Sequence, residues 1–168
     1  MKLIPLTKGY EAIVDDEDFE ELSRHKWHAK VHGRPGAVYA ARYFHRNGKG
    51  ITERMHRRIM QPARGLDVDH VNGNGLDNRR SNLRVCTRSE NCANSNGHSD
   101  RASRFKGVVA VHGGVWRAKI EVNYRNIHLG RFATEEEAAL AYNAAAVEHF
   151  GEFARLNEVT EEPISGEA

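Results

Sequence analysis

The 168-residue sequence holds 39% hydrophobic and 29% charged residues, and its mean hydropathy is −0.68. It has no apolar run near the roughly 20 residues that a membrane-spanning helix needs, and its N-terminus lacks the apolar core of a signal peptide. Two cysteines, Cys86 and Cys92, are too few for a disulfide framework or a four-cysteine zinc site. We therefore expect free thiols in a cytoplasmic protein with no membrane partner.

The formal net charge of +2 averages over unlike regions. Residues 1–60 carry 12 Lys and Arg against 8 Asp and Glu, whereas residues 158–168 carry four acids and no base. Without that acidic end, which we expect to be disordered, the charge is +6. Clustered basic residues favour binding to phosphate groups, and ten histidines in a short chain suggest metal or acid–base chemistry.

The first sixty residues predict short strands around one helix. Asp15 or Asp16 is typical of the residue that begins a helix, here one that runs through Leu22. Turns are predicted at 32–36, which contains Gly and Pro, and at 47–50. The predicted strands are residues 11–14, 27–31 and 37–45, followed by a strand and a short helix over 51–60.

The middle of the chain is polar and rich in turns, except for residues 83–86, which predict a strand. Thr87 and Glu90 form a capping-box pattern, in which the hydroxyl and the carboxylate each accept a backbone N–H. A helix is therefore expected to start after Thr87 and to carry Asn91 in its first turn.

The last third of the chain predicts a small sheet packed on one helix. Gly113 and Gly114 are typical of a hairpin turn, and Thr134 with Glu137 forms a second capping box. Gly151 suits the end of the helix that follows. The predicted strands are residues 105–112, 115–123 and 125–132, and the predicted helix is 135–150.

Polar side chains with catalytic potential gather between residues 69 and 91. Asp69 and His70 end one predicted strand, and Asn91 lies on the helix that can cross the hairpin. One carboxylate and one amide oxygen form an incomplete ligand set of the kind that Mg²⁺ prefers, with water and phosphate completing it. A neighbouring histidine can take a proton from an attacking water, so these parts suffice to hydrolyse a phosphodiester.

The order and spacing of these residues resemble the HNH endonuclease motif, and most closely that of phage and intron homing endonucleases. The resemblance covers about residues 55–98 and implies a ββα-metal finger that enters the minor groove of DNA. The matching residues are Asp69-His70-Val71-Asn72-Gly73-Asn74, Asp77-Asn78-Arg79, Asn82-Leu83-Arg84, Thr87 and Asn91.

The resemblance also implies roles for individual residues. Asp69 and Asn91 would bind one divalent ion, Mg²⁺ or Mn²⁺, together with the scissile phosphate. His70 would be the general base, and Asn82 would hold the loop so that His70 points correctly. His56 lies in a stretch that also resembles the family, and we expect it to be structural or to contact phosphate, outside the catalytic set.

Residues 104–157 resemble the Apetala/ethylene-response-factor DNA-binding domain, in which a three-stranded sheet lies in the major groove. The matching residues are Phe105-Lys106-Gly107-Val108, Trp116-Arg117-Ala118-Lys119-Ile120, His128-Leu129-Gly130-Arg131-Phe132, the Ala-rich helix from Glu135, and Leu156-Asn157. Several of the positions that contact DNA in that family differ here. Val109, Val111 and Glu121 stand where the family has arginine, and His128 stands where it usually has tryptophan. No target sequence is therefore carried over.

The second resemblance implies a set of DNA contacts on the sheet, while Trp116 and Phe132 are expected in the core. The residues expected to contact DNA are Lys106, Arg117, Lys119, Arg125 and His128.

These features predict an α+β protein with two functional parts, of which one cuts DNA and the other reads its sequence. The predicted segments are a β-rich N-terminal segment (1–54), an HNH ββα-metal nuclease (55–98), a linker (99–103), an Apetala/ethylene-response-factor-like domain (104–157) and an acidic tail (158–168).

The predicted function is that of a metal-dependent DNA endonuclease acting on double-stranded DNA, as a monomer or weak dimer, without a small-molecule cofactor. The expected setting is the cytoplasm of a phage-infected or prophage-bearing bacterial cell. The alternative is a non-catalytic DNA-binding transcriptional regulator that keeps the finger as scaffold. A third alternative is a structural zinc protein that uses several histidines, although none is paired with cysteines at ligand spacing.

Overall fold

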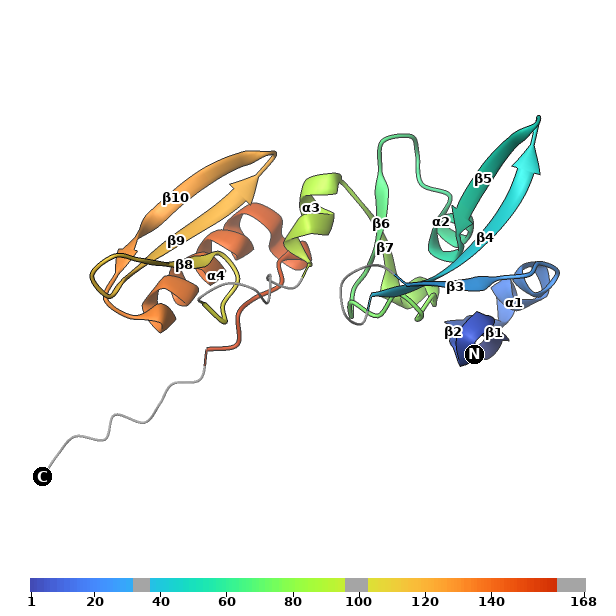
Figure 1. Cartoon of the computed structure of the whole chain (residues 1–168), viewed down its shortest axis with the longest axis horizontal. Helices are drawn as coiled ribbons and strands as arrows, with labels where there is room; N and C mark the ends of the chain where they lie inside the picture. Colours follow the sequence, from blue (N-terminus) through green and yellow to red (C-terminus); the bar gives the residue numbers. More distant parts are fainter. Residues whose placement is uncertain (32–36, 96–102, 160–168) are drawn as a thin grey trace, which may run out of the picture. The chain divides into compact units, whose positions relative to one another are not determined.

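The computed structural model describes residues 1–31, 37–95 and 103–159 and confirms the α+β class (Figure 1). The chain divides into two units, residues 1–91 (the N-terminal unit) and residues 92–168 (the C-terminal unit). Within the described residues, no helix combines the length and apolar character needed to cross a membrane. The predicted turn at 32–36 and most of the predicted linker and tail lie outside the described residues.

The N-terminal unit consists of short antiparallel pairings. β1 pairs with β2, the strands β3–β4–β5 form a three-stranded sheet, and β6 pairs with β7 in a separate hairpin. The elements are β1 (Lys2–Pro5), the 3₁₀ helix η1 (Thr7–Gly9), β2 (Glu11–Val14), α1 (Asp16–Ser23), β3 (His28–Val31), β4 (Val38–Arg46), β5 (Lys49–Arg54), α2 (Met55–Met60), β6 (Asp67–His70), the 3₁₀ helix η2 (Arg80–Asn82) and β7 (Leu83–Cys86).

One hydrophobic core joins these pieces. Leu22 of α1 and Met55 of α2 are almost completely buried, and the indole Nε1 of Trp27 donates to the carbonyl of Leu22 at 2.8 Å. The remaining buried members are Ile4, Leu6, Ala12, Val14, Ala29, Val38, Ala40, Ile59, Val68 and Leu83. Because Val68 and Leu83 come from β6 and β7, the hairpin with the candidate site is anchored in this core.

The long loop between β6 and β7 is held by the first part of the chain. Ile13 of β2 donates its N–H to the Leu76 carbonyl and accepts from the N–H of Asn78, both at 2.8 Å. The Asp15 carboxylate accepts from the N–H of Arg80, also at 2.8 Å. The β-rich N-terminal segment therefore positions the loop that follows His70.

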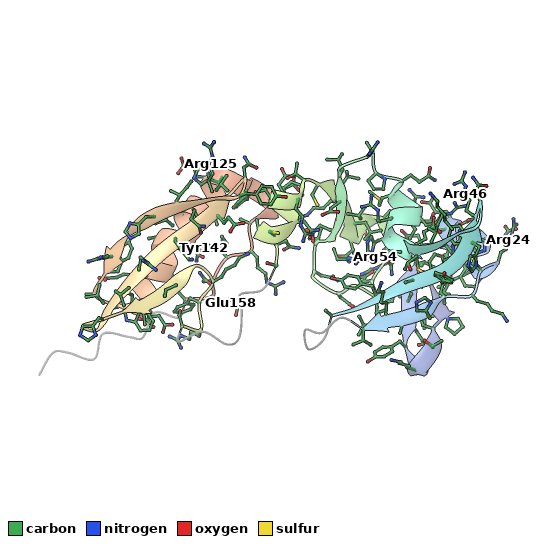
Figure 2. All side chains as sticks on the ribbon, turned by 45° about the horizontal axis from the view of Figure 1, so that its top comes forward. Arg24, Arg46, Arg54, Arg125, Tyr142 and Glu158 are labelled. Carbon is green, nitrogen blue, oxygen red and sulfur yellow. The ribbon has the colours of Figure 1, made fainter. Side chains whose placement is uncertain are left out.

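The C-terminal unit is a three-stranded antiparallel sheet with one face covered by a helix (Figure 1). Figure 2 shows Tyr142 between this helix and the sheet, where it is 4% exposed. The predicted capping box at Thr134 and Glu137 is confirmed, as is the helix end at Gly151. The elements are β8 (Val108–Val111), β9 (Val115–Val122), β10 (Arg125–Phe132), α4 (Glu135–Phe150) and the 3₁₀ helix η3 (Gly151–Phe153).

The division between the two units falls inside α3 (Arg88–Ala93), between Asn91 and Cys92. The predicted cap is present: Thr87 N–H donates to the Glu90 carboxylate at 2.7 Å, and Glu90 N–H donates to the Thr87 hydroxyl at 3.3 Å. Ala93, at the other end of the helix, is buried in the core of the C-terminal unit.

Candidate functional site

The hairpin β6–β7 presents its predicted site residues on two different faces. Asp69 lies opposite Arg84, and His70 lies opposite Leu83. Because side chains alternate along a strand, Asp67 and Asp69 share one face and His70 lies on the other. The hairpin therefore separates the carboxylate face from the face of the expected general base.

On the first face, Asp69 is buried and ion-paired. Its Oδ2 accepts from Nε of Arg84 at 3.1 Å and from Nη2 at 2.8 Å. The amide Nδ2 of Asn91, on α3, donates to Oδ2 of Asp67 at 3.3 Å. The structure thus places Asn91 against Asp67, two residues before Asp69 on the same side of β6.

Asp67 was missing from the predicted site. Nη1 of Arg57 and Nη1 of Arg88 each lie 3.5 Å from its carboxylate, so it joins α2, α3 and β6. The alternation of a strand was the available signal, since a residue two places before Asp69 must share its face.

On the second face, His70 is 5% exposed and surrounded by side chains. Its Nε2 lies 3.4 Å from Oδ1 of Asn78, whose own Nδ2 donates to the Leu76 carbonyl and so fixes the amide. The imidazole centroid is 4.9 Å from that of His56 and 5.9 Å from the Tyr39 ring. Burial lowers the pKa of His70, against the opposing effects of Asn78 and Asp69, so the imidazole is neutral at pH 7.

His56 packs against the ring of His70, on the second face of the hairpin. Burial, followed by the neighbouring His70, lowers the pKa of His56 to about 3. It is 3% exposed, and its Nδ1 has no hydrogen-bond partner among the described residues. His56 is thus part of the side-chain packing around His70.

Asn82 joins the two arms of the loop. Its Oδ1 accepts the N–H of Asn72 at 3.0 Å, and its Nδ2 donates to the Asp77 carbonyl at 2.8 Å. The Asp77 carboxylate binds the Arg79 guanidinium at 2.6 Å, which lowers the pKa of Asp77. Asn82 therefore connects Asn72, two residues after His70, to Asp77 farther along the loop.

Metal-ligand candidates are few in the described part of the chain. No group of three or more His, Cys, Asp or Glu side chains there is arranged to hold a metal ion. The predicted ligand pair, Asp69 and Asn91, contains only one side chain of these types, Asp69, beside an amide. Both cysteines are free thiols, and burial raises the pKa of Cys86 to about 12.

The C-terminal sheet has one face turned away from α4, and three of the five predicted DNA contacts lie on it. Arg117 and Lys119 alternate with the buried Ala118 and Ile120, and His128 lies opposite Lys119. The side chain of Arg117 therefore faces the open side of the sheet.

Arg131 was missed and also lies on the open face. The register of β10 shifts between His128 and Gly130, which brings Arg131 directly opposite Arg117. Nε of Arg117 is buried and has no hydrogen-bond partner among the described residues. Two like charges directly across a sheet destabilise it, so an anion between them would be favourable. A register shift of this kind leaves no clear mark in sequence.

The other two predicted contacts lie elsewhere. Arg125 is opposite Val122, on the side of the sheet that faces α4. The ammonium of Lys106 donates to the carbonyls of Cys92, Ala93 and Ser95 at the end of α3, and burial lowers its pKa to about 8. Lys106 therefore caps the C-terminal end of α3 through carbonyls of its own unit.

Residues 54–93 match the HNH endonuclease family. A protein of Acanthamoeba polyphaga mimivirus, described as an uncharacterized HNH endonuclease, is 29% identical over 158 residues, which are 90% of this chain and 77% of that protein. We call residues 54–93 the HNH segment. It spans α2, β6, β7 and α3, and it contains Asp69, His70, Asn82 and Asn91.

Part of the chain is similar to plant transcription factors. An AP2-like ethylene-responsive transcription factor of Arabidopsis thaliana is 43% identical over 74 residues, 42% of this chain and 20% of that protein. An AP2/ERF and B3 domain-containing protein of Oryza sativa subsp. japonica is 41% identical over 59 residues, 35% of this chain and 16% of that protein. The chain thus matches a fifth or less of each plant relative.

Proposed function

We propose that this protein is a metal-dependent DNA endonuclease of the HNH homing type, with a C-terminal unit that reads DNA sequence. The observation that carries the proposal is the surroundings of His70 inside the HNH segment. A buried, neutral imidazole ends β6 next to Asp69, and the loop after it is clamped by Asn82. A neutral imidazole is the state that accepts a proton.

Asn78 selects the nitrogen of His70 that acts as the base. Because the Asn78 amide donates through Nδ2 to Leu76, its Oδ1 faces His70 and favours the tautomer with the proton on Nε2. Nδ1 then carries the lone pair that takes the proton of the attacking water. Asn78 acts as a positioning residue in this scheme.

The proposed metal is one hard divalent ion, Mg²⁺ or Mn²⁺. Asp69, which pairs with Arg84 in this structure, would supply a carboxylate oxygen. Because Asp67 can only accept, it takes the N–H end of the Asn91 amide, which leaves the carbonyl oxygen of Asn91 as the end available to an ion. When bound by Asp69 and Asn91, such an ion would polarise the scissile phosphate and stabilise the charge of the leaving oxygen.

The proposed reaction is hydrolysis of one phosphodiester per site, giving 5′-phosphate and 3′-hydroxyl ends. One HNH segment per chain implies a nick, and cutting both strands would need a second copy or a second visit. On the C-terminal sheet, Arg117, Lys119 and Arg131 form the cationic face that supports binding to DNA.

Relaxation of supercoiled plasmid tests the proposal, with phage DNA included as a pool of further sites. We expect nicking with Mg²⁺, none with EDTA, and a loss of about a hundredfold or more in His70→Ala. His149→Ala, an exposed histidine on α4, is the matched control and should nick normally. Melting temperatures establish that the variants are folded.

A direct measurement of Mn²⁺ binding tests the metal ligands separately from activity. Asp69→Asn should weaken binding, seen by electron paramagnetic resonance of the free ion. DNA retention without nicking under several divalent ions would instead support the non-catalytic regulator. Nicking that persists in His70→Ala would contradict the assignment of the base.

A further inference from the structure

The hairpin of β4 and β5 extends beyond the rest of its sheet. β3 pairs with β4 only from Val38 to Ala41, whereas β5 continues the pairing to Arg46. Residues 42–53 therefore form a two-stranded ribbon that projects from the N-terminal unit, with Arg46 at its end (Figures 1 and 2). A two-stranded ribbon alone is marginally stable in water, so this projecting ribbon calls for a functional explanation.

The tip of the ribbon concentrates positive charge. Arg46 and Lys49 lie directly opposite each other and flank the Asn47-Gly48 turn. Like charges in this position repel, and neither side chain forms an ion pair with any of the described residues. An anion that binds between them would remove this repulsion.

An exposed aromatic pair lies next to the tip. The Tyr43 side chain is 60% exposed, and its ring meets that of His45 edge to face with centroids 5.3 Å apart. The Tyr43 ring lies over Gly50 of β5, so that a Cβ at Gly50 would collide with the ring and its hydroxyl. A large flat side chain held in this way is a surface for a sugar or a base.

The face of Tyr43 and His45 continues to the candidate site, whereas Arg46 and Lys49 lie on the opposite face of the ribbon by strand alternation. By strand alternation, Tyr39, Tyr43 and His45 share one face of β4, and Arg54 of β5 lies over the Tyr39 ring at 5.4 Å. Tyr39 in turn contacts the ring of His70. The residues of the sheet that lie on this face include no acid: His28, Lys30, Tyr39, Ala41, Tyr43, His45, Gly50, Thr52 and Arg54.

We propose that this ribbon is a second DNA-binding surface of the N-terminal unit, docked in a groove of the duplex whose backbone faces His70. The inference rests on the proposed function, and the ligand that it assigns to the ribbon is double-stranded DNA. The major groove, about 12 Å wide, admits a two-stranded ribbon. Arg46 and Lys49 contact phosphates, and Tyr43 packs on a sugar or base.

The length of the ribbon sets where these contacts fall. His45 lies six residue steps after Tyr39, which is about 20 Å at roughly 3.3 Å per residue. That distance corresponds to about six base steps at roughly 3.4 Å each. The ribbon tip should therefore protect DNA about six base pairs from the bond that is cut.

The test is binding of duplex DNA by the full chain in EDTA, where no cleavage occurs. Arg46→Gln with Lys49→Gln should reduce the dependence of log K on log salt by about 1.8, because two phosphate contacts are lost. Affinity at low salt should fall at least tenfold, and hydroxyl-radical protection should disappear on that flank. Tyr43→Ala should weaken binding, whereas Tyr43→Phe should retain it.

The matched control removes two positive charges elsewhere in the same unit. Lys8 and Lys26 are exposed and form no ion pair with the described residues, so Lys8→Gln with Lys26→Gln should change affinity less than twofold. If the ribbon variant shows the same salt dependence and footprint as the control, the inference is wrong. If the protein nicks DNA but the ribbon variant leaves the footprint unchanged, only the ribbon surface is rejected. If the footprint on the ribbon flank depends on Arg46 and Lys49 but the protein does not nick, only the nuclease is rejected.

Discussion

At the scale of single residues, burial and backbone conformation decide what each side chain can do. His56 and His70 are ordinary histidines in sequence, and burial in the folded protein lowers the pKa of both. Lys106 has the sequence position of a DNA contact, but three carbonyls at the end of α3 take its ammonium. Residue type alone therefore does not reveal which cations remain available to a ligand.

Burial of His56 predicts a loss of stability in mild acid. Its pKa is about 3 in the folded protein and about 6.5 when unfolded, so the unfolded chain takes up the proton first as pH falls. The free energy of unfolding should decrease from about pH 6.5 downward, by up to about 1.4 kcal/mol per pH unit. Urea unfolding between pH 7 and 5.5 checks this, above the range in which carboxylates titrate.

His56→Phe supplies the comparison for this effect. Because phenylalanine cannot be protonated, the decrease between pH 7 and 5.5 should be shallower in the variant, while His149→Gln should behave as the unsubstituted protein does. An identical slope in all three proteins would contradict the assignment to His56.

Gly107 predicts a strong effect of one added methyl group. Its φ is +78°, and a Cβ there would collide with the Tyr142 ring and lie 2.7 Å from the Lys119 carbonyl. Gly113 has a similar φ of +85° with nothing within 4 Å. Gly107→Ala should therefore lower the melting temperature of the C-terminal unit well beyond Gly113→Ala, which measures the backbone strain alone. Equal shifts would mean that the Tyr142 ring moves aside at little cost.

At the scale of elements, local signals located helix starts and turns well. Both capping boxes were predicted and are present, because a cap involves residues only three apart. The turn at Asn47-Gly48 is also present. β1 was not predicted, since four residues ending in Pro5 form a strand only by pairing with β2.

Thr134 predicts a measurable contribution of one cap to α4. Its hydroxyl accepts the N–H of Glu137 at 3.1 Å, and Glu137 returns a bond to the N–H of Thr134. Thr134→Ala should destabilise the C-terminal unit by about 1 kcal/mol in urea unfolding, and Thr134→Ser should restore most of it. A serine variant as unstable as the alanine variant would show that the cap is not responsible.

At the scale of the whole molecule, the chain holds separate cores in its two units. Met55 belongs to the core of the N-terminal unit, while Tyr142 and Phe150 belong to that of the C-terminal unit. The division falls inside α3, so one short helix ends one unit and begins the next. The boundary between the units therefore lies between Asn91 and Cys92.

Separate cores predict two unfolding transitions in calorimetry. Met55→Ala should lower one melting temperature, with a cost of about 2–5 kcal/mol for a buried side chain, and leave the other within a degree or two. Gly107→Ala should do the opposite. A single transition that both variants shift equally would show that the units unfold together.

The sequence by itself determined the α+β class, the capped helices and the HNH segment, because these depend on local periodicity and on fixed spacings along the chain. The tertiary structure alone decided that Asp67 binds Asn91, that Arg131 faces Arg117 and that Tyr39 links the ribbon to His70. Each of these contacts depends on strand register or on the packing of segments distant in sequence. No local pattern encodes such contacts, since they form only when separate elements bury their apolar faces together.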